Sequence, residues 1–272
     1  MKFHRRTIVT GLAATLASTR LANAAEPKSG RAPRTRQEWD AIIGSDFAGP
    51  LTCVRATPMT EGPFYYESSL QRRAIAEKLP GVPLRLGVTL GGLAQQEGRC
   101  FPLAGAVVDI WHTSAAGLYS DVGKALQPVD TTGQTFLRGH QFTDKNGYVE
   151  FDTIVPGWEI VAAAPPVKVA MRTTHIHLKA FHEREVITTQ LFFPDPLLDQ
   201  LYADVEPYKS HGLLTAPGLD RAYPRIRNAD DHFYTLAKAQ PMKVEKVDGV
   251  MTAKVTLGVL SQGDRGFRTL WR

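Results

Sequence analysis

The sequence predicts an all-β protein built as a single β-sandwich with long loops and a few short helices. Many short segments alternate apolar with polar or small residues, the period of two that is typical of half-buried strands. Turn residues such as Gly, Pro and Asn separate these segments. The chain has 272 residues and 43% hydrophobic content, which supports one large core but leaves room for only one sandwich.

The first 24 residues predict an export signal. Two arginines at positions 5 and 6 precede a mildly apolar stretch over residues 7–18, and Ala-Asn-Ala at 22–24 forms a small-x-small cleavage site. The paired arginines and weak hydrophobicity favour the twin-arginine route. The alternatives are an ordinary N-terminal helix or an uncleaved anchor, although the stretch is too short to span a bilayer. We therefore expect a periplasmic or extracellular protein.

Without this signal the chain is almost neutral. Residues 1–24 carry four basic and no acidic residues, so their removal lowers the formal net charge from +5 to +1. A nearly neutral protein lacks the electrostatic footprint of a nucleic-acid binder, and no other segment is apolar enough to enter a membrane. Residues 25–35, rich in Lys, Arg, Pro and Gly, predict a flexible linker, and residues 36–272 are expected to form the folded domain.

The elements are expected in the following order. A short helix is predicted over residues 36–43, and further short helices over 196–202 and 230–238. Strands are predicted over residues 84–90, 106–111, 148–154, 174–181 and 186–193. Asp248-Gly249, between residues 243–247 and 250–259, predicts a two-residue hairpin turn, because both residue types tolerate left-handed conformations.

His175-Ile176-His177 lies within one predicted strand. Residues two apart project from the same face of a strand, so both imidazoles can reach one ion. Imidazole suits iron, copper, zinc or nickel, and anionic oxygen ligands favour the harder, higher-valent ions. The companion ligands therefore decide the metal, and Tyr119 and Glu159 are the candidates.

Five segments follow one another in an order that resembles a known family. They are residues 111–120 (WHTSAAGLYS), 136–139 (FLRG), 143–148 (TDKNGY), 153–158 (TIVPGW) and 172–177 (RTTHIH), with 60–65 (TEGPFY) before them and 188–194 (TTQLFFP) after them. This series resembles the intradiol ring-cleavage dioxygenases, non-haem iron enzymes that act on catechol, hydroxyquinol and protocatechuate. The resemblance runs from about Cys53 to about Tyr208 and implies their β-sandwich.

The resemblance implies iron(III) held by two tyrosines and two histidines. Tyr119 matches the first tyrosine, and His175 and His177 match the histidines. At the position of the second tyrosine, directly after Pro-Gly-Trp, this chain has Glu159. Tyr148 resembles a non-ligand aromatic of the family. The expected ligand set is therefore Tyr119, Glu159, His175 and His177.

The implied reaction is cleavage of a catechol-type ring between its two hydroxyl-bearing carbons by dioxygen. Two other readings stay open. Glu159 with His175 and His177 makes the two-histidine, one-carboxylate set of non-haem iron(II), which suits a different oxidation of a phenol. A non-catalytic metal- or aromatic-binding module is the third, and copper, zinc or no metal are the alternatives to iron. Family members commonly assemble, so a homo-oligomer is also open.

Two further residues are implied as catalytic. Arg172 matches a family arginine that stabilises charge on the substrate, and Gln190 matches a glutamine near the metal pocket. Their alternatives are a surface arginine and a solvent-facing strand residue. Tyr65, Tyr66 and a loop over residues 160–171 are expected at the pocket entrance. The remaining histidines without a partner motif are expected to be structural or peripheral: His112, His140, His182, His211 and His232.

The chain has two cysteines, Cys53 and Cys100. In an oxidising compartment they predict a disulfide, and the alternative is two separately buried thiols. Their spacing does not suit a metal knuckle.

Overall fold

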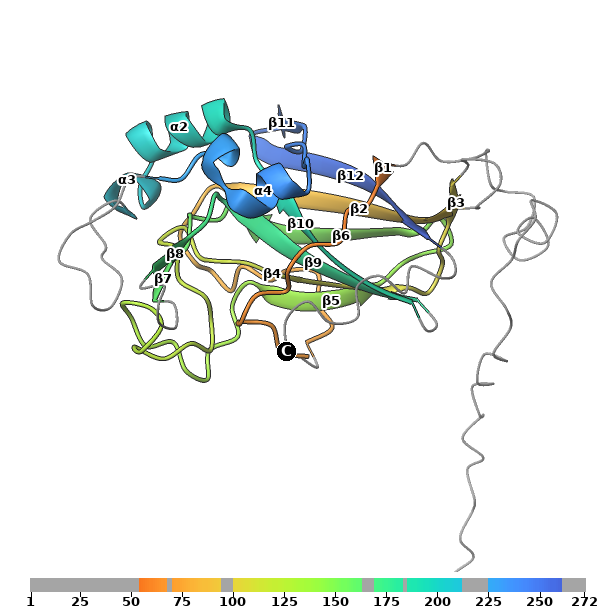
Figure 1. Cartoon of the computed structure of the whole chain (residues 1–272), viewed down its shortest axis with the longest axis horizontal. Coiled ribbons are helices and arrows are strands. Elements are labelled where there is room, and N and C mark those ends of the chain that lie inside the picture. The colour runs from red at the N-terminus through yellow and green to blue at the C-terminus, as the bar shows by residue number, and fades with distance from the viewer. Residues whose placement is uncertain are drawn as a thin grey trace, which may run out of the picture. The chain divides into compact units, whose positions relative to one another are not determined.

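A computed structural model describes residues 54–67, 70–93, 100–162, 169–182, 185–211 and 225–260. These residues all belong to one compact unit. The predicted signal, the linker and the helix expected over residues 36–43 lie outside them. Figure 1 shows the described part as two stacked layers of strands with short helices beside one end.

The first layer is a six-stranded sheet centred on a long strand. This strand, β2 (Pro83–Leu93), pairs in parallel with β12 (Val250–Leu260) and antiparallel with β6 (Tyr148–Ile154) and β3 (Cys100–Pro102). Two shorter strands, β1 (Val54–Arg55) and β11 (Val244–Val247), pair with β12. The hairpin between β11 and β12 turns at Asp248 and Gly249, both with positive φ, which confirms the predicted turn.

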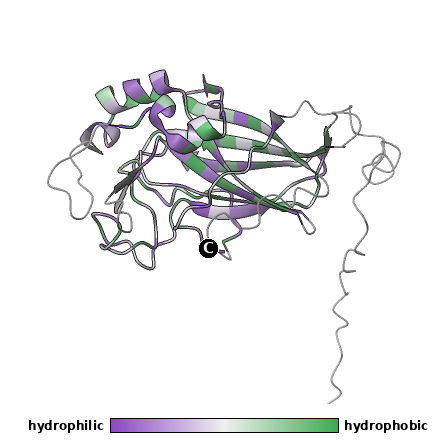
Figure 2. Ribbon diagram, in the orientation of Figure 1, coloured by the Kyte–Doolittle hydropathy of each residue, from purple (hydrophilic) through white to green (hydrophobic). Residues whose placement is uncertain are grey.

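The second layer is a four-stranded antiparallel sheet in the order β10-β9-β4-β5. Its strands are β4 (Val107–Trp111), β5 (Arg138–Phe142), β9 (His175–His182) and β10 (Glu185–Phe192). Three of the four match predicted strands. Figure 2 shows hydrophobic and hydrophilic residues alternating along strands of the molecule, and in this sheet β4, β9 and β10 each present an apolar face to the core.

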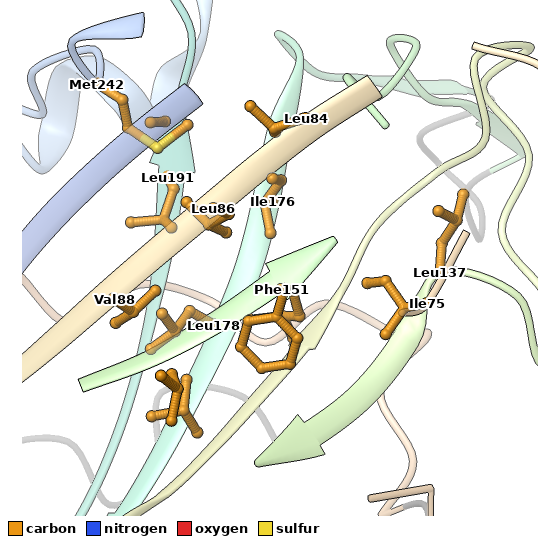
Figure 3. Close-up of a cluster of buried hydrophobic side chains, with 14 of the residues drawn as sticks. Ile75, Leu84, Leu86, Val88, Leu137, Phe151, Ile176, Leu178, Leu191 and Met242 are labelled. Carbon is orange, nitrogen blue, oxygen red and sulfur yellow. The ribbon is translucent and has the colours of Figure 1, made fainter. Parts of the chain in front are cut away.

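The apolar faces of the two sheets meet in one core. From the first sheet Leu84, Leu86 and Val88 point inward, and from the second sheet Ile176 and Leu178 meet them (Figure 3). All five side chains are at most 1% exposed. The all-β sandwich predicted from alternation is therefore confirmed. The opposite face of its second sheet does not take part in this core.

Some strands were not predicted. β5 was missed because its residues, Arg-Gly-His-Gln-Phe, show no apolar alternation. The loop predicted over residues 160–171 is wrong in part: β7 (Ile160–Ala162) and β8 (Val169–Met171) pair as an antiparallel hairpin. The backbone hydrogen bonds between these two short strands cannot be predicted from the apolar character of their residues.

The helices lie in the C-terminal half of the described chain. α2 (Asp195–Asp204) confirms the helix predicted over 196–202, and η1 (Asn228–Asp230) with α4 (His232–Leu236) confirms the one predicted over 230–238. A further turn, α3 (Tyr208–His211), was not expected. Among the described residues, no helix is both long and apolar enough to cross a membrane. Cys100 is disulfide-bonded, while Cys53 lies outside the described residues.

Candidate metal centre

The two histidines of the predicted site lie on the outer face of the four-stranded sheet. His175 and His177 alternate along β9 with Ile176 and Leu178, which face the core. In register with His177 are Trp111 on β4 and Gln190 on β10. The period of two thus sends both imidazoles to the same side, as the His-x-His spacing predicted.

Glu159 reaches this face because the segment before it is pinned to the turn after β4. Gly157 donates its N–H to the Ser114 carbonyl at 2.9 Å and accepts the Thr113 hydroxyl at 2.6 Å. A Cβ atom at Gly157 would collide with the Ala115 carbonyl oxygen, so this close approach requires glycine. The Pro-Gly-Trp segment therefore places Glu159 beside the Tyr119 loop.

Tyr119 is fixed mainly through its backbone. Its N–H donates to the Gln127 side-chain oxygen at 3.0 Å, and its carbonyl accepts from the Gln127 amide at 3.0 Å and from the Thr131 hydroxyl at 2.6 Å. The ring packs against Phe64 with 4.8 Å between centroids. These contacts hold the phenol, which is 1% exposed, toward the two histidines.

The four predicted ligands converge on one point. The Tyr119 hydroxyl donates to Glu159 Oε2 at 2.6 Å and lies 3.2 Å from His177 Nε2. His175 Nε2 and His177 Nε2 are 3.0 Å apart. The donor atoms of Glu159, His175 and His177 all lie within 4.8 Å of one another, and all three residues are buried. The structure therefore brings together four side chains from three separate segments.

These donors suit a metal ion. Donors bound at about 2.0–2.1 Å and at right angles around one ion lie roughly 3 Å from each other, the separation seen between the two imidazoles. His175 Nδ1 donates to the Thr173 carbonyl at 2.7 Å, which leaves the lone pair of Nε2 facing the other donors. Two nitrogen and two oxygen donors in a buried cluster fit the iron that the resemblance implies.

Burial sets the protonation of the cluster. It lowers the pKa of His175 to about 3 and that of His177 well below its ordinary value, so both imidazoles are neutral and free to coordinate. Burial and the adjacent Glu159 carboxylate raise the pKa of the Tyr119 phenol well above its usual range. Burial also raises the pKa of Glu159, although Arg172 opposes that shift.

The two histidines are supported differently. His175 has its hydrogen bond to Thr173, whereas His177 Nδ1 has no hydrogen-bond partner within the part of the chain that the structure describes. Instead, the indole of Trp111 stacks on the His177 ring, with centroids 4.7 Å apart and planes 5° apart. Gly62 lies on another side of this ring, because a Cβ atom added there would be 3.6 Å from His177 Cε1.

Arg172 and Gln190, predicted as catalytic, lie beside the cluster and contact each other. Arg172 Nη2 donates to Gln190 Oε1 at 2.7 Å, and Gln190 Nε2 donates to the Thr60 carbonyl at 2.9 Å. Arg172 is 8% exposed and Gln190 is 5% exposed. The surface-arginine and solvent-facing alternatives are therefore wrong for both residues.

Other expected positions differ in their outcome. Tyr65 packs on Trp111 with centroids 4.7 Å apart, and the Arg138 guanidinium lies over the Tyr66 ring, so this segment borders the site. Tyr148 lies in β6 and its hydroxyl donates to Glu150, away from the cluster. His112 is buried between Thr113 and Thr153 as a structural histidine.

Sequence reasoning missed two residues at the site. Trp111 supports His177, and its place in the WHTSAAGLYS segment was the available signal. Asp231 pairs with Arg172 across 59 residues of sequence, with 2.6 Å between Arg172 Nε and Asp231 Oδ2. No local pattern marks Asp231 beyond its suitability as a helix N-cap.

Residues 60–218 match the model of the family described as Dioxygenase, and this span holds every predicted ligand. The chain belongs to the intradiol ring-cleavage dioxygenase family. The family match confirms the resemblance stated from the motifs, and the structure has a possible metal site at Glu159, His175 and His177.

Curated relatives share part of their length with this chain. A chlorocatechol 1,2-dioxygenase of Rhodococcus opacus is 34% identical over 109 residues, which are 36% of this chain and 40% of the relative. One of Pseudomonas putida is 26% identical over 147 residues, which are 51% of this chain and 54% of the relative. The chain thus spans about half the length of the curated relatives that it matches.

Solved structures show the same architecture. An intradiol ring-cleavage dioxygenase from Tetranychus urticae superposes with a TM-score of 0.60 at 24% identity, covering 78% of this chain and 97% of that one. The 3-chlorocatechol 1,2-dioxygenase from Rhodococcus opacus 1CP gives a TM-score of 0.50 at 20% identity, with 74% and 70% covered. At these identities the structures support the fold alone.

Proposed function

We propose that this protein cleaves a catechol-type aromatic ring between its two hydroxyl-bearing carbons, using dioxygen and one iron bound by Tyr119, Glu159, His175 and His177. Both oxygen atoms enter the product, a muconate-type diacid. The observation that carries the proposal is the convergence of these four buried donors, with separations of 2.6–3.2 Å along the Glu159–Tyr119–His177–His175 chain.

Iron, when bound, would supply a Lewis acid for the two oxygens of a catechol-type substrate. We take iron(III) as the resting state, because two anionic oxygen donors favour the higher-valent ion. The protein's own contribution is to hold these donors in place, to keep water out of a buried site and to handle protons.

Glu159 is the proposed proton acceptor. Its Oε2 already accepts the Tyr119 hydroxyl at 2.6 Å, and the same atom can take the proton of a substrate hydroxyl that reaches the cluster. A carboxylate near a pKa of ~4.3 is a weaker base than a phenolate near ~10. Burial raises the pKa of Glu159 and narrows that gap. We therefore expect slower proton removal than a second tyrosine gives.

Arg172 supplies positive charge next to the reacting ring. Its guanidinium stays cationic in almost any environment, and its hydrogen bond to Gln190 directs it along the outer face of the sheet. Negative charge that develops on the substrate during ring opening is stabilised by such a fixed cation in a dry site. Gln190 orients the cation and joins it to the segment that begins at Thr60.

A second function has one observation in its favour. Glu159, His175 and His177 form a compact carboxylate and two-histidine group, the ligand type of many non-haem iron(II) oxygenases. With that centre, a phenolic substrate would be oxidised or oxygenated without intradiol cleavage. The chemical identity of the product distinguishes the two functions.

The test is oxygen uptake and product analysis with a panel of catechols and hydroquinones under ¹⁸O₂. The proposal predicts uptake in step with catechol loss and a ring-opened diacid that carries two ¹⁸O atoms, one in each new carboxyl group. Glu159→Gln should lower the rate strongly, whereas Glu245→Gln, an exposed change on β11, should not. Hydroxylated or extradiol products select the second function, and iron-loaded protein without oxygen uptake contradicts both.

We also propose that the mature protein acts outside the cytoplasm. The support is the sequence of residues 1–24, with paired arginines and a small-x-small site. Mass spectrometry of protein recovered from a bacterial periplasm should show a chain beginning at Ala25. Retention of the full-length chain in the cytoplasm, unaffected by Arg5→Lys with Arg6→Lys, contradicts it.

A further inference from the structure

A carboxylate outside the residues that match the family model lies against the site. Asp231 is 2% exposed, and it belongs to the segment joining η1 to α4, beyond residue 218 where the family match ends. Its two oxygens accept hydrogen bonds from two different parts of the molecule. One part is the entry to β9, and the other is the first turn of α4.

The contacts to the β9 entry involve both a side chain and the backbone. Asp231 Oδ2 accepts Arg172 Nε at 2.6 Å and the Thr173 N–H at 2.9 Å, and Oδ1 accepts Arg172 Nη2 at 3.2 Å. Two parallel bonds from one guanidinium to one carboxylate fix the plane of the arginine. Arg172 Nη2 also donates a hydrogen bond to Gln190 Oε1 at 2.7 Å.

Thr173 connects Asp231 to the candidate ligand His175. Its N–H is held by Asp231, its hydroxyl donates to Asn228 Oδ1 at 2.8 Å, and its carbonyl accepts His175 Nδ1 at 2.7 Å. The ring orientation of His175 therefore depends on Thr173, a residue whose N–H and hydroxyl are held by Asp231 and Asn228. Support of this kind fixes both the tautomer and the direction of a ligating imidazole.

We propose that Asp231 is a positioning residue of the site, which holds Arg172 toward the substrate and Thr173 toward His175. The proposal deepens the proposed function, because it assigns the C-terminal segment a part in the same chemistry. Arg172 is held further by the ring of Phe233, 4.5 Å from the guanidinium carbon. Asp231 acts through these groups and does not itself touch the reacting atoms.

Asp231 also has a purely structural task, which the test must separate. Its Oδ1 accepts the Tyr234 N–H at 2.9 Å and so caps α4. Asn and Ser are good N-caps. Asp231→Asn and Asp231→Ser therefore keep the cap while removing the ion pair to Arg172. Asp230→Asn, an exposed neighbour, is the matched control.

The experiment measures iron affinity by chelator competition and, separately, kcat and KM for the best catechol. We expect Asp231→Asn to weaken iron binding and to lower kcat, each by about 10–100-fold, with a smaller change in KM. Asp230→Asn should change neither quantity. If Asp231→Asn does not fold, the same measurements are made on Asp231→Ser.

Wild-type iron affinity and kcat in either folded variant overturn the proposal, as does an equal loss in Asp230→Asn. A merely structural role lowers the thermal midpoint and leaves both quantities unchanged. The affinity measurement needs no turnover, so it still tests Asp231 if the wild-type protein opens no catechol ring. In that case the proposed function fails, and the positioning of His175 is judged alone.

Discussion

The two faces of the four-stranded sheet are built from the same strands but have opposite contents. Along β9, Ile176 and Leu178 enter a core shared with the other sheet, while His175 and His177 enter a polar, buried cluster. The apolar face has no polar atoms to orient, and its packing depends only on the shape and volume of the side chains. On the outer face each donor atom must point in a defined direction, and residues from distant segments of the chain hold it there.

The largest expected effect is on the outer face. His177→Ala should remove a metal donor and lower turnover by more than about 100-fold, beyond the roughly 10–100-fold cost of losing a residue that supports a ligand. Iron content and oxygen uptake measure this. His182→Ala, at the end of the same strand, is the control and should keep both. Full iron content in His177→Ala would remove His177 from the ligand set.

The matching change on the inner face should act on stability instead. Leu178 is fully buried, so Leu178→Ala should lower the free energy of unfolding by about 2–5 kcal/mol, measured by urea denaturation. The folded fraction should still bind iron, because the donors project from the other face. Val186→Ala, 56% exposed on β10, should cost less than about 0.5 kcal/mol. Loss of iron without loss of stability in Leu178→Ala contradicts this division.

The pH dependence of stability tests the protonation of Asp109, a carboxyl group buried on the outer face of the sheet. Asp109 is 5% exposed, and burial raises its pKa from 3.8 to about 7, although Tyr65, Arg138 and Lys179 offset part of the shift. The folded state therefore binds this proton more tightly than the unfolded state. Its contribution to stability falls as the pH rises from about 4 to about 7, and is constant above that.

Asp109→Asn removes this titration while keeping a neutral side chain of similar shape. Relative to the wild type, its free energy of unfolding should rise between pH 5 and pH 8 by on the order of 2 kcal/mol. Denaturation at the two pH values measures the difference. Asp204→Asn, exposed on α2, removes the same charge at the surface and serves as the control. Parallel stability curves for wild type and Asp109→Asn contradict the buried charge.

The smallest effect concerns the stacking on His177. Trp111→Leu loses the aromatic partner and should weaken iron binding by about 2–10-fold, since such pairs contribute roughly 0.5–1.5 kcal/mol. Trp111→Phe keeps a ring and should remain closer to the wild type. Chelator competition orders the three proteins, and equal affinities for Leu and Phe would show that Trp111 only fills space.

Long strands with one buried face could be predicted from the sequence, whereas several short strands could not. Alternation along residues 84–90 and 174–181 predicted a strand in each sheet, because a strand that is buried on one face has an apolar residue at every second position. β5 has no such pattern and was not predicted, and the residues of β7 and β8 were predicted to form a loop. In these short strands the pairing depends on neighbours distant in sequence, which local periodicity does not contain.

In the site, too, residues within local motifs were predicted, whereas residues that depend on partners distant in sequence were not. The His-x-His spacing placed two donors on one face by geometry alone, and the motifs supplied Tyr119, Glu159, Arg172 and Gln190. Asp231 could not be predicted, because its partners Arg172 and Thr173 lie 59 and 58 residues away. Trp111 was visible within a motif, but its stacking on His177 is a contact between strands that only the register of β4 with β9 creates.

The proposed centre depends on Glu159 as an iron ligand, and one spectrum tests this role most directly. Iron(III)-loaded wild type should show the colour of one phenolate ligand from Tyr119. Glu159→Tyr should show a stronger phenolate-to-iron band, while Glu159→Phe, which fills similar space without a donor, should not. Identical spectra for Glu159→Tyr and Glu159→Phe at full iron loading would contradict the proposed centre.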